Sequence, residues 1–182
     1  MKILIFGASG SGTTTLGKEL ELKFDFVHLD ADDYYWKATQ PPFQEKISLS
    51  ERNKTLTKDF KKNKNVIISG SMVSWGEEWK SAFDLAIFIY LRPKIRIERL
   101  KEREKIRLGD KLLTDKQTQE SSVEFIEWAK KYDDPNFLGR SLKVHNDWIK
   151  LLKYPVIRID GEMNLTAKVK KVLSELKIIN RN

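Results

Sequence analysis

An apolar run that leads directly into a glycine-rich turn opens this chain, and it constrains the fold more than any other feature. The sequence begins MKILIFGASGSGTTTLGK, in which the run KILIF precedes three glycines and then a segment compatible with a helix. A strand, a glycine-rich turn and a helix form the context of a phosphate-binding loop of pattern G-x-x-x-x-G-K-[ST]. Gly7, Gly12 and Thr14 match that pattern, but Thr13 stands where the pattern has lysine. A dinucleotide-binding turn is the rival interpretation, and the glycine spacing with the hydroxyls that follow favours the phosphate loop.

Short apolar runs alternate with helical patterns along the rest of the chain. The helical patterns cover 14–24 and 48–62, begin again at Pro93, and end with an apolar face of Leu165, Val169, Val172, Leu173 and Leu176. Runs with little polar alternation are typical of strands that are buried on both faces. Strands that alternate with helices predict a parallel, doubly wound α/β sheet. The expected strands are 2–6, 26–29, 65–69, 85–91 and 155–159.

Composition narrows the class of protein further. A chain of 182 residues is expected to form one domain, and its formal charge of +8 favours anionic partners, either nucleic acid or small phosphorylated molecules. A solvated lysine-rich surface is the plainer interpretation of the same charge. The sequence has no cysteine and no apolar window long enough to span a membrane. Its first apolar run is too short for a signal peptide, because glycines follow it directly. We therefore expect a cytoplasmic protein that does not associate with membranes.

The loop can bind phosphate without its lysine, because backbone N–H groups from Gly10 to Thr14 and the start of a helix both favour an anion. Thr14 is placed to bind Mg²⁺ through its hydroxyl, whereas Thr13 offers no charge. The missing cation must come from elsewhere, and Lys18 is expected to face solvent. The residues predicted to bind the nucleotide are Gly7, Ser9, Gly10, Ser11, Gly12, Thr13, Thr14 and Thr15.

Arginine and lysine separate onto opposite sides of the basic segment 92–111, which holds nine basic and four acidic residues. Arginine suits bidentate contacts with phosphate, so this sorting favours a phosphate-binding face over the alternative, a helix of ion pairs with Glu98, Glu102 and Glu104. If the segment is one helix, its arginine stripe holds Arg92, Arg96, Arg99, Arg103 and Arg107.

Acidic residues follow the second expected strand, at the edge where open α/β sheets bind ligands. Asp30 and Asp32 suit a magnesium ligand and a group that orients an acceptor hydroxyl, or else they begin a helix, which is the role expected for Asp33. Arg52 is expected either to anchor an anionic acceptor or to lie on the surface. The histidines at 28 and 145 are expected in the core or at its boundary. Aromatic residues around the segment QPPF (40–43) would wall a substrate pocket or form a small core: Tyr34, Tyr35, Trp36 and Phe43.

In the order of these motifs the sequence resembles the P-loop kinases of small molecules, in the adenylate kinase and shikimate kinase branch. LDAD at 29–32 resembles the acceptor-binding D-x-D of shikimate kinases, and Arg99–Leu100 with Arg103 is similar to the helix that enters the lid. The segment YDDPNFLGR resembles a stretch of adenylate kinases that implies phosphate contact for Arg140. The resemblance implies one domain over 1–182, with strand order 2-3-1-4-5, an acceptor-binding insert at about 32–64 and a small helical lid at about 104–138.

Two departures from the family bear on function. Thr13 replaces the lysine, and SGSMVSWG at 69–76 lacks the Asp and Arg of nucleoside monophosphate kinases, which suits an acceptor with sugar-like hydroxyls. We expect a phosphotransferase that uses ATP and Mg²⁺, with Thr14 and Asp30 at the metal, as a monomer or weak homodimer. The alternatives are a catalytically weak nucleotide-binding sensor or scaffold and, ranked last, an RNA-binding protein. The predicted catalytic residues are Asp32, Arg99, Arg103 and Arg140, and the predicted acceptor-binding residues are Asp32, Arg52, Ser69, Ser71 and Trp75.

Overall fold

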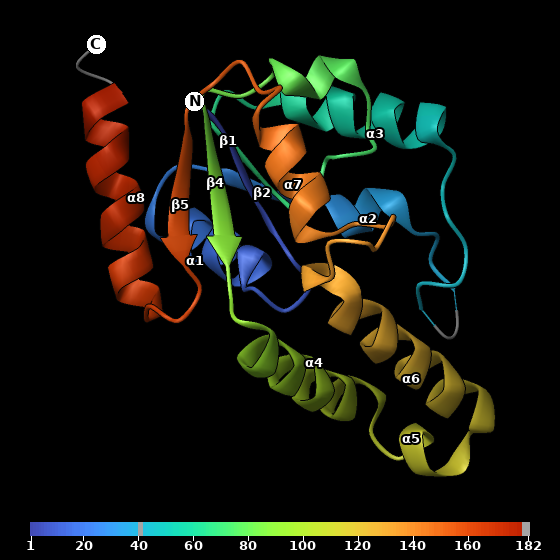
Figure 1. Ribbon diagram of the computed structural model, residues 1–182. Helices are drawn as coiled ribbons and strands as arrows, with labels where there is room; N and C mark the ends of the chain where they lie inside the picture. The colour runs from blue at the N-terminus through green and yellow to red at the C-terminus, as the bar shows by residue number, and fades with distance from the viewer. Residues whose placement is uncertain (40–41, 180–182) are drawn as a thin grey trace.

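The computed structural model describes residues 1–39 and 42–179, so Gln40 and Pro41 of the QPPF segment lie outside the described residues. Five strands form one sheet in which every neighbouring pair is parallel, in the order β2-β3-β1-β4-β5. This order confirms the fold expected from the alternation of strands and helices (Figure 1). The strands are β1 (Lys2–Gly7), β2 (Val27–Asp30), β3 (Val66–Ser69), β4 (Leu85–Tyr90) and β5 (Val156–Asp160).

Helices begin where local sequence favours them. Pro93 occupies the first turn of its helix, where it has no amide hydrogen to lose, and the Ser48 and Ser141 hydroxyls cap two others. The α-helices are α1 (Thr13–Lys23), α2 (Ala31–Tyr35), α3 (Leu49–Lys62), α4 (Pro93–Leu108), α5 (Lys111–Thr114), α6 (Lys116–Lys130), α7 (Leu142–Ile149) and α8 (Leu165–Ile179). The short 3₁₀ helices are η1 (Glu77–Lys80) and η2 (Lys131–Asp133).

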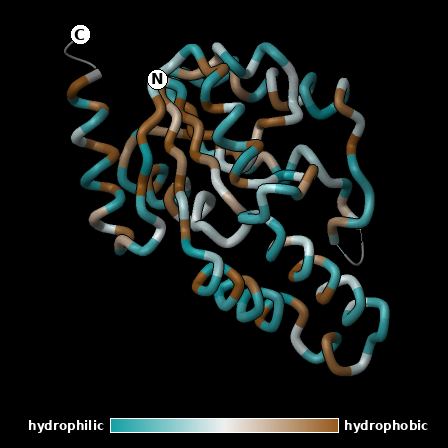
Figure 2. Tube along the Cα trace, viewed as in Figure 1, coloured by the Kyte–Doolittle hydropathy of each residue, from teal (hydrophilic) through white to brown (hydrophobic). Residues whose placement is uncertain are grey.

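Alternate residues of β1 face two separate cores. Ile3 and Ile5 pack with residues of α1 and α8, whereas Leu4 and Phe6 pack with residues of α3 and α7. The central strands are therefore apolar on both faces, as their sequence predicts (Figure 2). This three-layer arrangement gathers the carboxyl ends of all five strands at one edge of the sheet, beside the glycine-rich turn.

Three helices, α4 to α6, extend away from the sheet on the side of that edge (Figure 1). Leu100 of α4 packs against Ile126 and Ala129 of α6, so the first and last of these helices form a hairpin with its own small core. Arg96 lies on the same face of α4 and is fully buried, donating to the Ala129 carbonyl and to Asp133. The expected arginine stripe is therefore not one ligand-facing surface, because α6 covers its centre.

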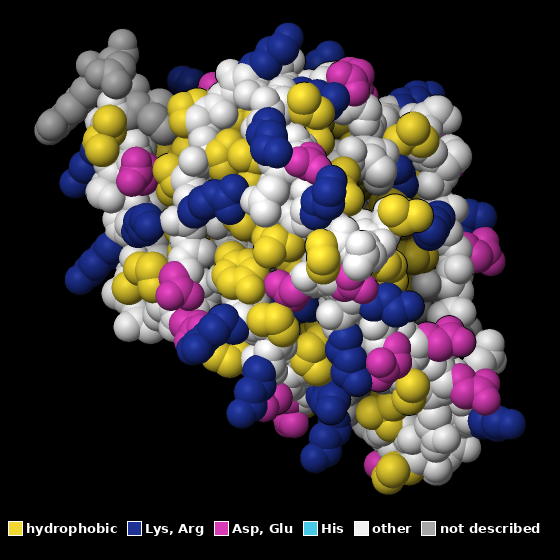
Figure 3. Space-filling view, in the orientation of Figure 1, with side chains coloured by type: hydrophobic (Ala, Val, Ile, Leu, Met, Phe, Trp, Pro, Cys, Tyr) yellow, Lys and Arg dark blue, Asp and Glu magenta, His cyan; other side chains and the backbone are white. Residues whose placement is uncertain are grey.

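Basic side chains are scattered among acidic ones over the face shown in Figure 3. Of the five stripe arginines, Arg92 pairs with Glu162 and Arg107 pairs with Glu104. Within residues 1–39 and 42–179, no helix combines the length and apolar character needed to cross a bilayer.

Candidate functional site

The glycine-rich turn forms an open cradle between β1 and α1. Gly10 and Gly12 have φ values of +83° and +94°, which residues with a side chain rarely adopt. α1 begins at Thr13, and no side chain caps its first turn. The first N–H groups of α1 therefore remain available, together with the turn of the loop, to bind a phosphate group.

Helix α4 supports this cradle from behind. A Cβ atom on Gly10 would lie 2.9 Å from Leu100 Cγ and 3.1 Å from the Arg96 carbonyl oxygen. Ser11 is fully buried, and its hydroxyl has no partner among the described residues. The position of the phosphate loop thus depends on how α4 is held against the rest of the molecule.

Asp30 is the centre of a hydrogen-bond cluster next to the cradle. Its carboxylate accepts from the Thr14 hydroxyl at 2.8 Å, from the Ser69 hydroxyl at 3.1 Å and from the Asp32 backbone N–H at 3.1 Å. His28 Nε2 lies 2.9 Å from the Ser69 hydroxyl oxygen. Ser69 is fully buried, so it supports Asp30 rather than offering a free hydroxyl to an acceptor.

The pair formed by Thr14 and Asp30 offers the oxygen ligands that Mg²⁺ prefers. No group of three or more His, Cys, Asp or Glu residues that could hold a metal ion occurs in the described part of the chain. A protein site for Mg²⁺ beside a nucleotide does not require such a group, because phosphate oxygens and waters supply the remaining ligands. The two residues therefore fit a magnesium ion shared with a nucleotide.

Asp32 stands at the mouth of the site, exposed at the surface although protein surrounds its carboxylate closely. Desolvation and the neighbouring Asp30 charge raise the pKa of Asp32, and the charges of Arg140 and Arg103 oppose that rise. Three predicted catalytic residues thus share one electrostatic environment. A carboxylate with a raised pKa is better suited to take a proton than an ordinary aspartate.

Arg140 and Arg103 reach this site from different elements. Arg140 Nη2 donates to the Ser9 hydroxyl of the phosphate loop at 3.4 Å, and its guanidinium lies 5.1 Å from the centre of the Trp128 ring. The Arg103 side chain is 53% exposed and lies over the Phe125 ring. A positive charge therefore lies next to the loop that lacks a lysine, whereas Lys18 is exposed on α1 as expected.

Arg99 takes a different position from the other two predicted catalytic arginines. It is exposed, and its charge acts on the turn between β5 and α8. The pKa of Lys168 in this region is lowered first by burial and then by Arg99. Arg99 is therefore near the β5–α8 turn, and it is not among the charges that shift the pKa of Asp32.

Arg52 lies in α3 with only 7% of its surface exposed. Its guanidinium lies 4.4 Å from the centre of the Tyr35 ring and 4.8 Å from that of Trp75, and it donates to the Ser74 carbonyl at 3.0 Å. Its Nε has no partner within the described residues. Trp75 is 1% exposed and so contributes by fixing Arg52, not as the acceptor contact that the sequence suggests.

Ser71 follows β3 and belongs to a second cluster that the sequence did not reveal. Its hydroxyl lies 2.9 Å from His145 Nε2, and the Tyr132 hydroxyl lies 2.7 Å from His145 Nδ1. The histidine is fully buried, as its helix face predicts, but Ser71 is 74 residues away in the sequence and Tyr132 belongs to a separate element 13 residues earlier. No spacing or motif in the chain signals that these three residues meet.

Known proteins are similar to this chain in sequence and in fold. A family model described as an AAA domain matches residues 3–124. The uncharacterized protein YqaC of Bacillus subtilis is 40% identical over 174 residues, which cover 96% of each chain. A shikimate kinase of Enterococcus faecalis is 28% identical over 115 residues, or 55% of this chain and 65% of that enzyme.

The fold itself recurs in a solved structure. Shikimate kinase from Bacteroides thetaiotaomicron superposes with a TM-score of 0.58 at 18% identity, covering 97% of this chain and 98% of the other. At that identity the likeness shows the fold alone. The five-stranded arrangement and the glycine-rich turn after β1 are therefore those of a P-loop kinase fold.

Proposed function

The chain belongs to the AAA domain family, and from that premise we propose that it is a Mg²⁺-dependent kinase that transfers a phosphoryl group from ATP to a small molecule. The observation that carries the proposal is the hydrogen bond between Thr14 at the start of α1 and Asp30 at the end of β2. It joins the cradle, a metal-binding pair and the neighbouring Asp32 within one site. The P-loop kinase fold supports the same reaction class.

The cradle would bind the phosphates of ATP through backbone N–H groups at the start of α1, with Thr14 and Asp30 holding Mg²⁺ beside them. When bound, Mg²⁺ neutralises charge on the phosphates. Arg140 and Arg103 would supply the positive charge that Thr13 lacks. Arg99 faces the β5–α8 turn, so we assign it to the nucleotide end of the cleft rather than to the transferred group.

Asp32 would orient the acceptor hydroxyl and take its proton. The acceptor oxygen forms a bond to the γ-phosphorus as the bond from that phosphorus to the β–γ bridging oxygen breaks, which leaves ADP. The proton passes from the acceptor hydroxyl to the Asp32 carboxylate. Phosphoryl transfer depends mostly on positioning and charge neutralisation, so arginines from other segments can replace a loop lysine in kind.

Arg52 indicates the class of acceptor. A guanidinium that packs against two rings is a fixed positive charge and would suit a carboxylate or phosphate group on the molecule. Ser71 follows β3 and would meet the same molecule. We therefore propose a small hydroxy compound that also bears an anionic group.

Isothermal titration calorimetry with ATP, with and without Mg²⁺, tests the binding step. We expect heat of binding that depends on Mg²⁺, and Asp30→Asn should remove most of the dependence because the amide cannot replace the carboxylate as a metal ligand. Asp33→Asn, a change at an exposed neighbour, is the matched control and should bind as the original chain does. No heat at millimolar ATP would contradict the proposal.

Thr13 favours one competing function, a protein that binds nucleotide but turns it over poorly. Thr13→Lys separates the two by an assay of ATP consumption over a panel of hydroxy acids, sugars, aminoglycoside-type alcohols and nucleoside monophosphates. If Arg140 and Arg103 already supply the charge, the substitution changes turnover little. A gain of about tenfold or more would favour the weak nucleotide-binding protein.

A further inference from the structure

A buried chain of hydrogen bonds connects the lid to the acceptor side of the site. It runs from the Tyr132 hydroxyl in η2 to His145 in α7, and from His145 to the Ser71 hydroxyl after β3. Tyr132 is 4% exposed and His145 is fully buried, whereas Ser71 is only partly buried. This row of hydrogen bonds is therefore buried in protein at its Tyr132 end and open to solvent at its Ser71 end.

The open end lies near Asp32. Gly70, which precedes Ser71, approaches α2 so closely that a Cβ atom on it would lie 2.9 Å from Ala31 Cβ. Asp32 is the residue that follows Ala31 in that helix. The Ser71 hydroxyl and the Asp32 carboxylate thus belong to adjoining segments at the same edge of the sheet.

His145 is neutral in this setting. Burial, and then the charge of nearby Arg140, lower the pKa of His145 to about 3. A neutral imidazole carries one N–H donor and one nitrogen acceptor, and the partners of the ring decide which nitrogen holds the proton. The donors and acceptors along this row of hydrogen bonds can therefore be arranged in two ways. The arrangement decides whether the Ser71 hydroxyl donates to the acceptor molecule or to His145.

The buried Tyr132 hydroxyl decides which tautomer His145 adopts. Within the described residues the Tyr132 hydroxyl has only His145 Nδ1 as a partner. If Nδ1 carried the proton, the Tyr132 hydroxyl hydrogen would be buried with no acceptor, which is costly. If Tyr132 donates to Nδ1, every hydrogen of the buried part is used, and Nε2–H donates to the Ser71 oxygen.

We propose that Tyr132 fixes His145 as the Nε2–H tautomer and thereby makes Ser71 a hydrogen-bond donor toward the acceptor molecule. The Ser71 oxygen accepts from His145, which leaves its own hydrogen free for the cleft. The acceptor must then present an oxygen lone pair at this point, as a carboxylate, carbonyl or ether group does. Ser71 is a specificity-determining residue, and His145 and Tyr132 are positioning residues. The role in acceptor binding rests on the proposed kinase function.

Nitrogen NMR of histidine-labelled protein, without nucleotide or acceptor, reads the tautomer directly. The chain has two histidines, so His28→Gln assigns the His145 signals. We expect at pH 7 an unprotonated Nδ1 and a protonated Nε2 in His145. A protonated Nδ1, alone or in an imidazolium ring, would overturn the inference whether or not the protein is a kinase.

Tyr132→Phe removes the donor and keeps the ring that packs beneath Arg96. In this variant nothing at position 132 pairs with Nδ1 in either tautomer, so the restraint on the ring is lost. We expect a measurable share of the Nδ1–H form, in which Ser71 donates to Nε2. Tyr154→Phe is the matched control, since Tyr154 is also buried but donates to the Trp79 carbonyl. It should leave the His145 signals unchanged. An unchanged tautomer in Tyr132→Phe would show that the tyrosine does not set it.

Kinetics then test the consequence for the acceptor found in the activity panel. Ser71→Ala and Tyr132→Phe should each raise KM for that acceptor about three- to tenfold, the range expected for one lost hydrogen bond, with little change in kcat. Equal falls in kcat with constant KM would contradict a role in acceptor binding. If no acceptor is phosphorylated, the kinase proposal fails while the NMR result still decides the tautomer.

Discussion

Asp133→Ala tests how helix α4 is fixed against the phosphate loop. Asp133 is the only carboxylate in the described structure that pairs with Arg96, a guanidinium with no exposed surface. Arg96 belongs to the part of α4 that packs on Gly10, and through Asp133 it joins α4 to η2. Removing the carboxylate leaves a buried positive charge without its counter-charge.

The size of the effect follows from burial. Breaking a buried ion pair by removing one partner costs about 3–5 kcal/mol. Asp133 is 21% exposed, so water partly replaces its carboxylate in the variant, and we expect a loss near the lower limit, about 3 kcal/mol. With an m-value of about 2–3 kcal/mol/M in urea, the unfolding midpoint should fall by about 1 M.

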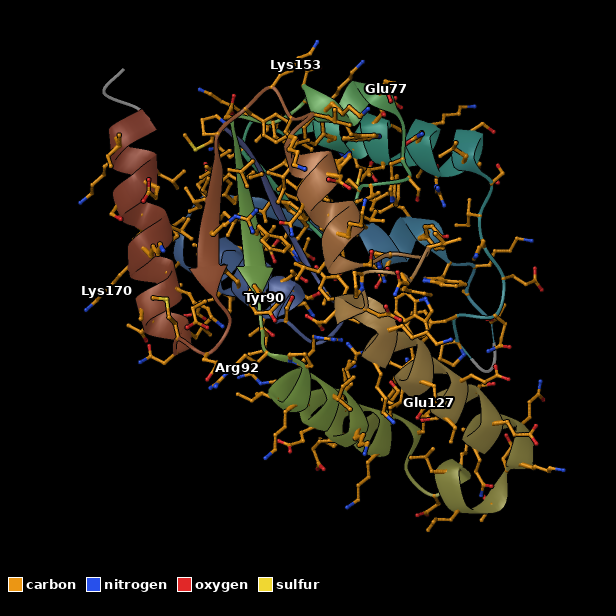
Figure 4. The ribbon with its side chains drawn as sticks, viewed as in Figure 1. Glu77, Tyr90, Arg92, Glu127, Lys153 and Lys170 are labelled. Carbon is orange, nitrogen blue, oxygen red and sulfur yellow. The ribbon has the colours of Figure 1, made fainter. Side chains whose placement is uncertain are left out.

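Urea unfolding at pH 7, followed by tryptophan fluorescence, measures that shift. Glu162→Ala is the matched control because it removes the partner of Arg92. Arg92 lies four residues before Arg96, and its side chain is 67% exposed (Figure 4). Water solvates the exposed guanidinium, so the midpoint of the control should not move measurably. Equal shifts in both variants would refute the reasoning that burial makes the Arg96 pair important.

Three further changes test the site itself. Gly10→Ala places a side chain at φ +83° and should lower Tm by several degrees in a thermal-shift assay, since such strain costs about 1–3 kcal/mol. The pKa of Asp32 is raised, so as pH falls the carboxylate gains a proton at a higher pH than an ordinary aspartate does. Because a protonated Asp32 cannot take the proton of the acceptor, kcat/KM should fall over that range of pH. Asp32→Asn should remove this fall at acid pH. Trp128→Leu removes the ring beneath Arg140 and should weaken ATP binding about threefold, with no further loss in an Arg140→Met background, as calorimetry would show.

Most of the fold was predictable because its signals are local. A strand buried on both faces is an apolar run, and Pro93 and the glycine-rich turn mark helix starts within a few residues of sequence. The five expected strands agree with the observed ones to within a residue or two at their ends. The sheet order followed from the family resemblance, which connects the turn after β1 to one fold.

The candidate site was less predictable, because a helical period shows which residues share a face but not what covers that face. Arg96, Leu100 and Glu104 are spaced four residues apart and are all buried, and the first two contact residues of α6. Arg103 is displaced from that row and remains exposed toward Asp32. The separation of arginine from lysine along α4 therefore holds for two different roles, the buried ion pair of Arg96 and the exposed Arg103 near Asp32.

Residues at the end of β3 and in the loop that follows it show the same limit. Ser69 and Trp75 have the chemistry of acceptor contacts, yet both are buried and act through Asp30 and Arg52. The distinction depends on which side chains of an irregular loop turn inward, and no period governs that choice. Tyr132 reaches the site only because η2 packs against α7, a contact that arises from tertiary structure.

The missing lysine is best understood through the segment that brings Arg140 to the loop. Arg140 directly precedes Ser141, which caps α7, and it packs against Trp128 near the end of α6. A lysine within the loop would hold its charge on the phosphates wherever helices α4 to α6 lay. A charge held by the junction of α6 and α7 reaches Ser9 only while that junction keeps its place against the sheet. Replacing Thr13 by lysine therefore adds charge but does not reproduce this dependence, so we expect affinity for ATP to depend on the packing of α6.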